Sequence, residues 1–358
     1  MTKRFPIALT ADCPDAALSD ALWRLNVHGV RQGSRNGPVL KIPGPAITTY
    51  PRPQQRVMFS PMRDANPFFH LYESLWMLAG KHDATSVSRY AAHMETFAQD
   101  GDLWGAYGWR WRSFFGFDQL AEIVDILKKD PTTRRAVLSM WSPNGDLVPT
   151  SAGSGVWASK DVPCNTQVYF DATSGELDMT VCNRSNDAVW GAYGANVVHM
   201  SILHEYIALA ARLPLGVYHQ FSNNLHIYSE RPDVQRLIEV KAGSRTVRFT
   251  PDMRYHGGAS GVNVSPLGGP YSDMSSWLEE CEAIVADPTT CENGYQHDFF
   301  QHVALPLFSA HKAYKDGDLE GALHYIYNAQ GDPNGDWIVA GAEWIQRRID
   351  ARAKKAAA

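Results

Sequence analysis

Apolar side chains recur at helical spacing in the first part of the chain. Residues 14–31 and 118–130 show this pattern with polar residues in between, which is typical of helices that bury one face. Residues 67–80 are mostly apolar, with Pro67 near the start and Gly80 at the end. Because proline suits the first turn of a helix and glycine suits its end, we expect a buried helix at 67–80.

Alternating apolar and polar residues predict strands in the middle of the chain. Residues 166–171 and 176–185 flank the turn sequence ATSG, which indicates a hairpin. Residues 134–141 begin with two arginines and form a further strand candidate. A long helix with a largely apolar face is expected at 197–213, and the chain then returns as a strand at 216–228.

The character of the sequence changes after about residue 241. Glycine and proline are frequent in residues 254–273, which predicts an irregular segment. Helices and strands are mixed without regular alternation and without a GxGxxG motif after a strand, which favours an α+β fold over a doubly wound one. We expect residues 1–240 to form the main domain and residues 241–358 to pack on it as an irregular segment and a helical extension. The helices expected in the extension span 274–286, 297–315, 319–329 and 335–354.

The composition of the 358 residues is that of an ordinary soluble protein, with 44% hydrophobic and 20% charged residues. The formal net charge of −5 argues against a protein whose main task is to bind nucleic acid. No stretch approaches the roughly 20 apolar residues of a membrane span, and the N-terminus lacks the pattern of a secretory signal. We therefore expect a cytoplasmic protein with neither a membrane nor a nucleic-acid partner.

The cysteines are odd in number and irregularly spaced, without a CxxC pair or a Cys/His ligand rhythm. This pattern indicates neither a metal site nor a disulfide framework, and it suits a reducing compartment. The five cysteines are Cys13, Cys164, Cys182, Cys281 and Cys291.

Cys164 lies in VPCNTQVYF, directly before a strand candidate. An isolated cysteine is more often a small buried hydrophobe than a nucleophile. Here Pro163 precedes it and the polar residues 165–167 follow, which favours a presented position. The polar residues of NRSNDAVWGAYGAN (183–196) and of HIY (226–228) adjoin apolar segments and require polar partners.

These motifs, in this order, resemble those of the thymidylate synthase family. The resemblance includes PC at 163–164, RSND at 184–187, an asparagine leading into a long helix, and HIY at 226–228. SRNG, YESLWMLAG, GDLWGAYGWRWR and DPTTRRAVLSMW resemble the family's arginine loop, glutamate helix, tyrosine segment and paired-arginine strand. These ordered motifs, spread over about residues 15–230, are highly specific in combination. The resemblance implies a mixed sheet flanked by helices, a catalytic domain in residues 1–240, and a homodimer.

The resemblance also implies the chemistry. Cys164 would add to C6 of a pyrimidine deoxynucleoside monophosphate, so that C5 attacks the methylene of 5,10-methylenetetrahydrofolate. Nearby arginine charge is expected to lower the pKa of Cys164. Glu73, a carboxyl that is costly to bury as a charge, would order water and move protons, and Tyr107 would assist proton removal at C5. The residues implied as catalytic are Cys164, Glu73, Tyr107, Asn165 and Asp187.

The implied binding residues fall into two groups. Arginines would hold the phosphate, with two of them supplied by the other subunit, while Asn196 would pair with the base edge and HIY would bond the sugar hydroxyl. The implied nucleotide-binding residues are Arg35, Arg184, Ser185, Asn196, His226 and Tyr228, with Arg134 and Arg135 from the other subunit. Those implied on the folate side are His93, Asp187, Trp190 and Gly191.

Four departures from the family pattern favour water addition over hydride transfer. Asn165 replaces a histidine, His93 replaces a tryptophan that stacks on folate, and residues 191–196 are one residue longer than the family's run. The apolar C-terminal lid is replaced by a helical extension. A wetter site would give a hydroxymethyl rather than a methyl group, as in the nucleotide hydroxymethylases of bacteriophages. We therefore expect a C5 hydroxymethylase that would act in the host cytoplasm if phage-encoded.

Asn196 favours dUMP as the substrate, because family members acting on dCMP carry an aspartate there. Three alternatives remain at this point. The chain could be a dCMP hydroxymethylase, a divergent thymidylate synthase making dTMP, or an inactive relative that binds nucleotide or RNA through its arginines. A purely structural role would leave the polar positions unexplained.

Overall fold

The computed structural model describes residues 5–147, 161–241, 244–256, 261–289 and 294–356, so Cys291 lies outside the described residues.

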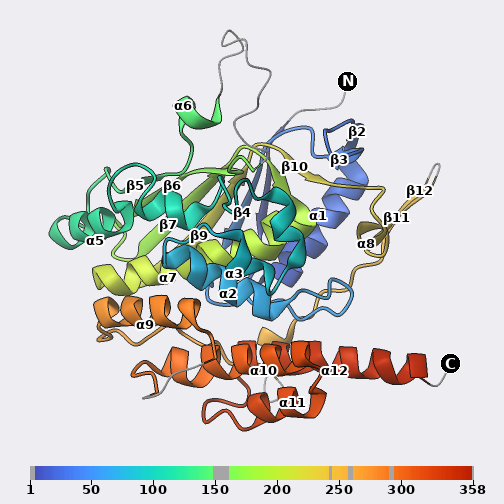
Figure 1. The fold of residues 1–358 in the computed structure, drawn as a ribbon. Helices are drawn as coiled ribbons and strands as arrows, with labels where there is room; N and C mark the ends of the chain where they lie inside the picture. Colours follow the sequence, from blue (N-terminus) through green and yellow to red (C-terminus); the bar gives the residue numbers. More distant parts are fainter. Residues whose placement is uncertain (1–4, 148–160, 242–243, 257–260, 290–293, 357–358) are drawn as a thin grey trace.

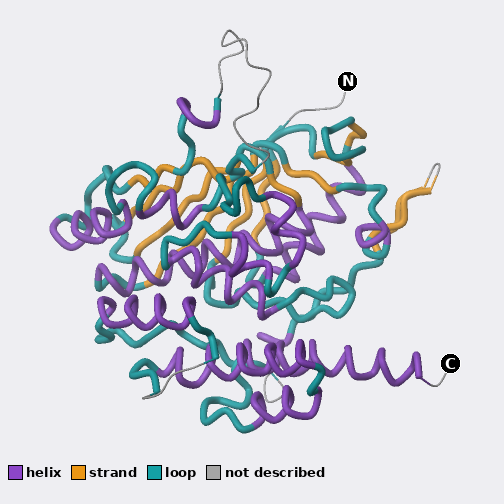
Figure 2. The backbone as a smooth tube through the Cα atoms, viewed as in Figure 1, coloured by secondary structure: helices purple, strands orange, loops and turns teal. Residues whose placement is uncertain are grey.

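The largest sheet among the described residues has six strands, in the order β1–β4–β9–β7–β6–β5. The pairs β1–β4 and β9–β7 are parallel, and the other neighbours are antiparallel. This mixed topology with flanking helices confirms the α+β prediction (Figures 1 and 2). The strands are β1 (Ile7–Thr10), β4 (Ala46–Tyr50), β9 (Leu215–Ser222), β7 (Leu177–Asn183), β6 (Asn165–Asp171) and β5 (Val137–Ser139).

The two faces of this sheet differ in exposure. The predicted hairpin is confirmed, since β6 and β7 pair antiparallel, and successive side chains along each strand point to opposite faces. On the inner face Val168 and Val181 are fully buried. On the outer face Ile47 is 37% exposed and Tyr169 is 42% exposed. The outer face of this single chain is therefore only partly covered.

A second sheet of four strands lies beside the first, and it corrects one prediction. Residues 216–228 were expected to form one strand, but the chain turns at Asn223–Asn224 and continues as β10 in the second sheet. Asparagine favours turns, and here the backbone N–H of Asn223 donates to the carbonyl of Asn183. The second sheet contains, in order, β2 (Val30–Gln32), β3 (Val39–Lys41), β10 (Leu225–Ile227) and β8 (Asn186–Asp187).

The four helices predicted before residue 241 are confirmed, with boundaries that differ by one to three residues. Almost every residue of α2 and α7 is buried, because these two helices pack between the sheet and the C-terminal helices. The side chain of Asn66 caps α2 by accepting from the N–H of Phe69, and Pro67 occupies its first turn. The four helices are α1 (Pro14–His28), α2 (Pro67–Leu78), α5 (Gln119–Lys129) and α7 (Asn196–Ala211).

Shorter elements connect these helices and strands. They are α3 (Ala84–Ser88), η1 (Ala92–Phe97), α4 (Tyr107–Arg112), α6 (Pro143–Asp146), η3 (Ala188–Ala195), α8 (Pro232–Gln235), η4 (Arg254–His256), and the hairpin of β11 (Ile238–Lys241) and β12 (Ser244–Val247).

The C-terminal helices form a separate layer beneath α2 and α7, orange to red in Figure 1. Helices appear in all four predicted segments, and the described part of 254–273 holds only one short helical turn, as expected. Buried polar contacts join the C-terminal part of the chain to α2 and α7: the hydroxyl of Tyr72 donates to the carbonyl of Val285, and Glu205 accepts from the N–H of Leu267, which precedes α9. The layer consists of α9 (Met274–Ala286), η6 (Phe300–Ala304), α10 (Leu305–Asp316), α11 (Leu319–Tyr327) and α12 (Asp336–Ala356).

Candidate active site

Two cavities meet at Cys164. The first, of about 430 Å³, lies between α2, the start of α7 and the loop before β6. The second, of about 540 Å³, lies between the loop at 32–36 and the residues that follow β7. Both cavities are lined by Asp161, Val162 and Cys164. A ligand in either cavity can therefore reach the same sulfur.

Arg184 holds the backbone that presents this sulfur. Its Nε donates to the carbonyl of Pro163 at 2.9 Å, and its Nη2 donates to the carbonyl of Val162 at 2.9 Å. The same Nη2 lies 4.0 Å from the Sγ of Cys164. These bonds leave Nη1 of Arg184 available to a ligand in the second cavity, which Arg184 also lines.

The ionisation of Cys164 differs from the sequence prediction. Burial raises the pKa of Cys164, and the positive charge of Arg184 only partly offsets this effect. Asp161 raises the pKa of the same thiol further, whereas Arg35 lowers it. The arginine charges therefore act in the predicted direction, but the pKa of Cys164 is raised overall, because loss of hydration outweighs the attraction to the guanidinium groups.

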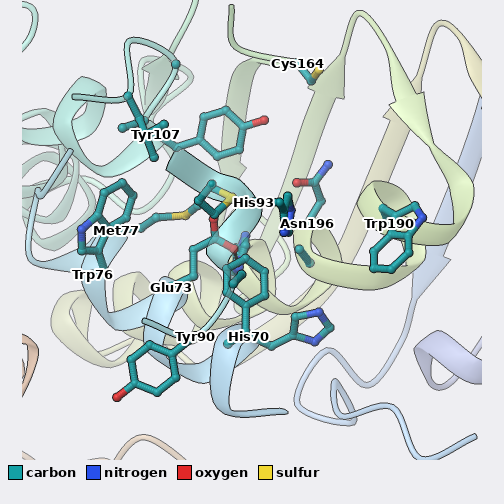
Figure 3. A pocket seen from close by; sticks show the side chains of 18 of the residues that line it. His70, Glu73, Trp76, Met77, Tyr90, His93, Tyr107, Cys164, Trp190 and Asn196 are labelled. Carbon is teal, nitrogen blue, oxygen red and sulfur yellow. Dashed lines mark ion pairs between the residues drawn. The ribbon is translucent and has the colours of Figure 1, made fainter. Parts of the chain in front are cut away.

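Glu73 and Tyr107 lie in the first cavity, as Figure 3 shows. Glu73 projects from α2, is buried, and places Oε2 at 3.0 Å from Nε2 of His199 on α7. The hydroxyl of Tyr107 accepts from the backbone N–H of Asn165 at 3.4 Å. Burial raises the pKa of Tyr107, so its phenol is neutral at physiological pH.

His199 was missed by the sequence reasoning. It lies three residues after Asn196 on α7, and residues at that spacing share one face of a helix. A histidine within an otherwise apolar helix face was the available signal. One helical turn before Glu73 on α2, His70 also lines the cavity, and burial lowers its pKa well below the usual value.

A π-helical segment, η3, precedes Asn196 in the run that was expected to be one residue longer than the family's. The N–H of Asn196 donates to the carbonyl of Gly191, five residues back rather than four. A wider turn of this kind takes up one added residue without displacing the helix that follows. Asn196 consequently still lines the first cavity at the start of α7.

A second asparagine fixes the amide of Asn196. Its Nδ2 donates to Oδ1 of Asn186 at 3.1 Å, and Nδ2 of Asn186 donates to Oγ of Ser222 at 3.1 Å. Gly191 lies against this pair: a Cβ there would stand 2.7 Å from Oδ1 of Asn186. Gly191, expected on the folate side, lines neither cavity and instead leaves room for the two amides.

The second cavity brings together the expected phosphate and sugar ligands. His226 on β10 is buried and lies edge-on to Tyr228, with ring centroids 5.3 Å apart. The predicted residues that line this cavity are Arg35, Cys164, Arg184, Ser185, His226 and Tyr228.

Two of the residues expected on the folate side, His93 and Trp190, line the first cavity. Trp190 is 40% exposed, and the guanidinium of Arg63 lies 4.2 Å from its ring centroid. Asp187 lines neither cavity; its carboxylate accepts from the N–H groups of Val189 and Trp190 and so caps η3. Burial raises the pKa of Asp187.

Three further predicted residues line neither cavity of this single chain. Arg134 and Arg135 are exposed in the segment before β5, at the edge of the large sheet. Asn165 is fully buried, and its side-chain amide has no hydrogen-bond partner among the residues that the structure describes.

The comparisons with known proteins agree with this geometry. The family profile described as "Thymidylate synthase" matches residues 32–255, which contain every predicted site residue. The chain belongs to the thymidylate synthase family. The resemblance inferred from the ordered motifs is thereby confirmed.

Three relatives within the thymidylate synthase family are named deoxyuridylate hydroxymethyltransferase. The protein of Pseudomonas phage M6 is 44% identical over 350 residues, covering 96% of this chain and 95% of the relative. The protein of Bacillus phage SP01 is 34% identical over 71% of this chain and 68% of its own length. The protein of Delftia phage PhiW-14 is 30% identical over 75% of this chain and 77% of its own length.

Within the described ranges, no group of three or more His, Cys, Asp or Glu side chains is arranged to hold a metal ion. None of the helices in the described part of the chain is both long and apolar enough to cross a bilayer.

Proposed function

We propose that this protein transfers a one-carbon unit from 5,10-methylenetetrahydrofolate to C5 of dUMP and adds water to it, giving 5-hydroxymethyl-dUMP. The observation that carries the proposal is the position of Cys164, at the junction of an arginine-lined cavity and a cavity lined by Glu73, Asn196 and His199. The names of the phage relatives support the same activity.

The second cavity suits a nucleoside monophosphate. Arg35 and Arg184 offer guanidinium groups to the phosphate, and Ser185 offers a hydroxyl. His226 and Tyr228 lie in the same cavity and can bond a sugar hydroxyl. A nucleotide held this way would direct its base toward Cys164 and the first cavity.

The amide of Asn196 suits uracil. Its Oδ1 can accept the N3–H of uracil, and its Nδ2 carries two hydrogens, so it can donate to O4 while keeping its bond to Asn186. Rotating the amide to suit cytosine would bring Oδ1 of Asn196 against Oδ1 of Asn186. Two facing acceptors repel each other, which favours dUMP over dCMP.

The first cavity suits the folate co-substrate. Trp190 offers a partly exposed indole face, and Arg63 beside it offers positive charge for a carboxylate. When bound, methylenetetrahydrofolate supplies the one-carbon unit. The residues of this chain orient the base, supply the Cys164 sulfur, and carry protons through Glu73 and Tyr107.

A homodimer follows from the same proposal. The half-covered outer sheet face, with Ile47 and Tyr169 exposed, provides an apolar surface for a second copy. Arg134 and Arg135 are exposed at the edge of that sheet and line neither cavity of their own chain. We infer that they complete the phosphate site of the other subunit.

The proposal is tested by incubating the protein with dUMP and methylenetetrahydrofolate and identifying the products by mass spectrometry. We expect 5-hydroxymethyl-dUMP and tetrahydrofolate, and no product from the Cys164→Ser variant. Methylated nucleotide with dihydrofolate would identify a thymidylate synthase instead. Higher kcat/KM for dCMP than for dUMP would identify the cytosine-directed enzyme.

A further inference from the structure

Glu73 and His199 lie next to each other in the lining of the first cavity. They lie on different helices, α2 and α7, and Oε2 of the carboxylate is 3.0 Å from Nε2 of the imidazole. His199 is only 3% exposed, and both residues line the cavity. Two packed helices therefore hold a carboxyl group and an imidazole together in the cavity that Cys164 also lines.

Both side chains have unused hydrogen-bonding capacity. Among the described residues, neither Oε2 of Glu73 nor either ring nitrogen of His199 has an aligned hydrogen-bond partner. Buried polar groups are almost always paired, because an unpaired buried group has lost its hydration without gaining a hydrogen bond. A polar pair that lines a cavity and is unsatisfied by protein is suited to binding a small polar molecule such as water.

Three other charged or titratable side chains that line the cavity are either uncharged or already engaged by other groups. His70 faces it from α2, and burial lowers the pKa of His70 so far that its imidazole is neutral. Arg63 lines the same cavity, but its Nε donates to the carbonyl of Val189 and its guanidinium stacks on Trp190. Asp161, across the cavity, accepts from the N–H of Gly105.

We propose that Glu73 and His199 together hold the water that adds to the exocyclic methylene of the nucleotide, which makes His199 a further catalytic residue. The inference rests on the proposed hydroxymethylase activity. The water oxygen bonds to the methylene carbon, and the electron pair of the C5–methylene double bond moves to C5 and its carbonyl. That pair then restores the C5–C6 double bond and expels the Cys164 thiolate, while the water proton passes to the Glu73–His199 pair.

The test separates the late step from the earlier ones by following a single turnover of dUMP deuterated at C5. Deuteron release reports bond formation and proton removal at C5, and 5-hydroxymethyl-dUMP reports water addition. In the His199→Leu variant we expect the rate of deuteron release to stay unchanged while formation of 5-hydroxymethyl-dUMP slows by about 100-fold. A factor of this size is typical for the loss of a general acid or base. A covalent nucleotide adduct on Cys164 should accumulate. His199→Gln keeps an N–H near the Nε2 position and should recover about tenfold of the loss.

His204 provides a matched control, because it is buried on the same helix, lines neither cavity, and bonds the carbonyl of Leu177. His204→Gln should lower thermal stability without changing the ratio of product to released deuteron. Equal loss of both signals in His199→Leu, or product that keeps pace with release, would overturn the role of His199. Absence of deuteron release in the wild-type protein would instead overturn the proposed function itself.

Discussion

The sulfur of Cys164 is subject to two opposing effects. Burial raises the pKa of the thiol, and Arg184, whose Nη2 lies 4.0 Å away, lowers it without restoring the usual value. The thiol of the free protein is therefore protonated at neutral pH. The sequence indicated Cys164 as the candidate nucleophile, because its neighbours form a recognisable motif. It did not indicate the ionisation of the thiol, which depends on how deeply the folded chain buries the sulfur.

This balance predicts how Cys164 reacts with iodoacetamide in the absence of nucleotide. Because the raised pKa of the Cys164 thiol lies above the pH range of this experiment, the thiolate fraction and the alkylation rate should rise about tenfold per pH unit from about pH 7 to pH 9. Removing positive charge in Arg184→Ala should raise the pKa further and slow alkylation at each pH, whereas Arg184→Lys should slow it less. Peptide mass spectrometry separates Cys164 from the other cysteines. A rate that levels off below pH 8 would contradict the raised pKa.

Among the elements, the long ones were predictable and the short ones were not. The side chains of Asn66 and Asp118 cap α2 and α5, Pro14 begins α1, and α7 is a long, mostly apolar segment, so local sequence is sufficient for these four helices. Strands β1, β3 and β4 have three to five residues and form through pairing with distant parts of the chain, which local patterns do not reveal. The π-helical turn η3 was visible only as one extra residue before Asn196.

The packing of η3 predicts the effect of Gly191→Ala. In an ordinary helix this change is stabilising by about 1 kcal/mol, but here the added Cβ would stand 2.7 Å from Oδ1 of Asn186. The Asn186–Asn196 pair must separate, so we expect kcat/KM for dUMP to fall by about tenfold or more and the preference for dUMP over dCMP to weaken. Gly269→Ala, where an added Cβ meets nothing within 4 Å, is the control. Unchanged selectivity in Gly191→Ala would show that the pair does not fix the base.

At the scale of the whole molecule, the C-terminal layer reaches the cavity wall. Asp64 lines the first cavity, and Arg347 and Arg348 of α12 both donate to its carboxylate. Although burial acts in the opposite direction, the two arginines hold the pKa of Asp64 below its usual value. The helices of this layer were predictable from periodicity, but ion pairs between residues more than 280 positions apart were not.

Removing the ion pairs between α12 and Asp64 is expected to affect one substrate more than the other. The double variant Arg347→Ala/Arg348→Ala releases Asp64 and the adjacent Arg63, which stacks on Trp190. We expect KM for methylenetetrahydrofolate to rise about tenfold, with a much smaller change in KM for dUMP. Arg352→Ala, one turn further along α12, removes a cation without touching Asp64 and should leave both constants unchanged. Steady-state kinetics with each substrate varied in turn would measure the two KM values. An equal change in both KM values of the double variant would contradict a specific role of the ion pairs at the folate side.

The shared sulfur also has a thermodynamic consequence. Because Cys164 belongs to the walls of both cavities, a molecule that occupies one cavity changes the surface offered to a molecule entering the other. The affinities of the two ligands are thereby coupled, and linkage requires the coupling to be mutual. If bound nucleotide changes the affinity for folate by some factor, bound folate changes the affinity for nucleotide by the same factor. Each substrate is, in this sense, an effector of the other.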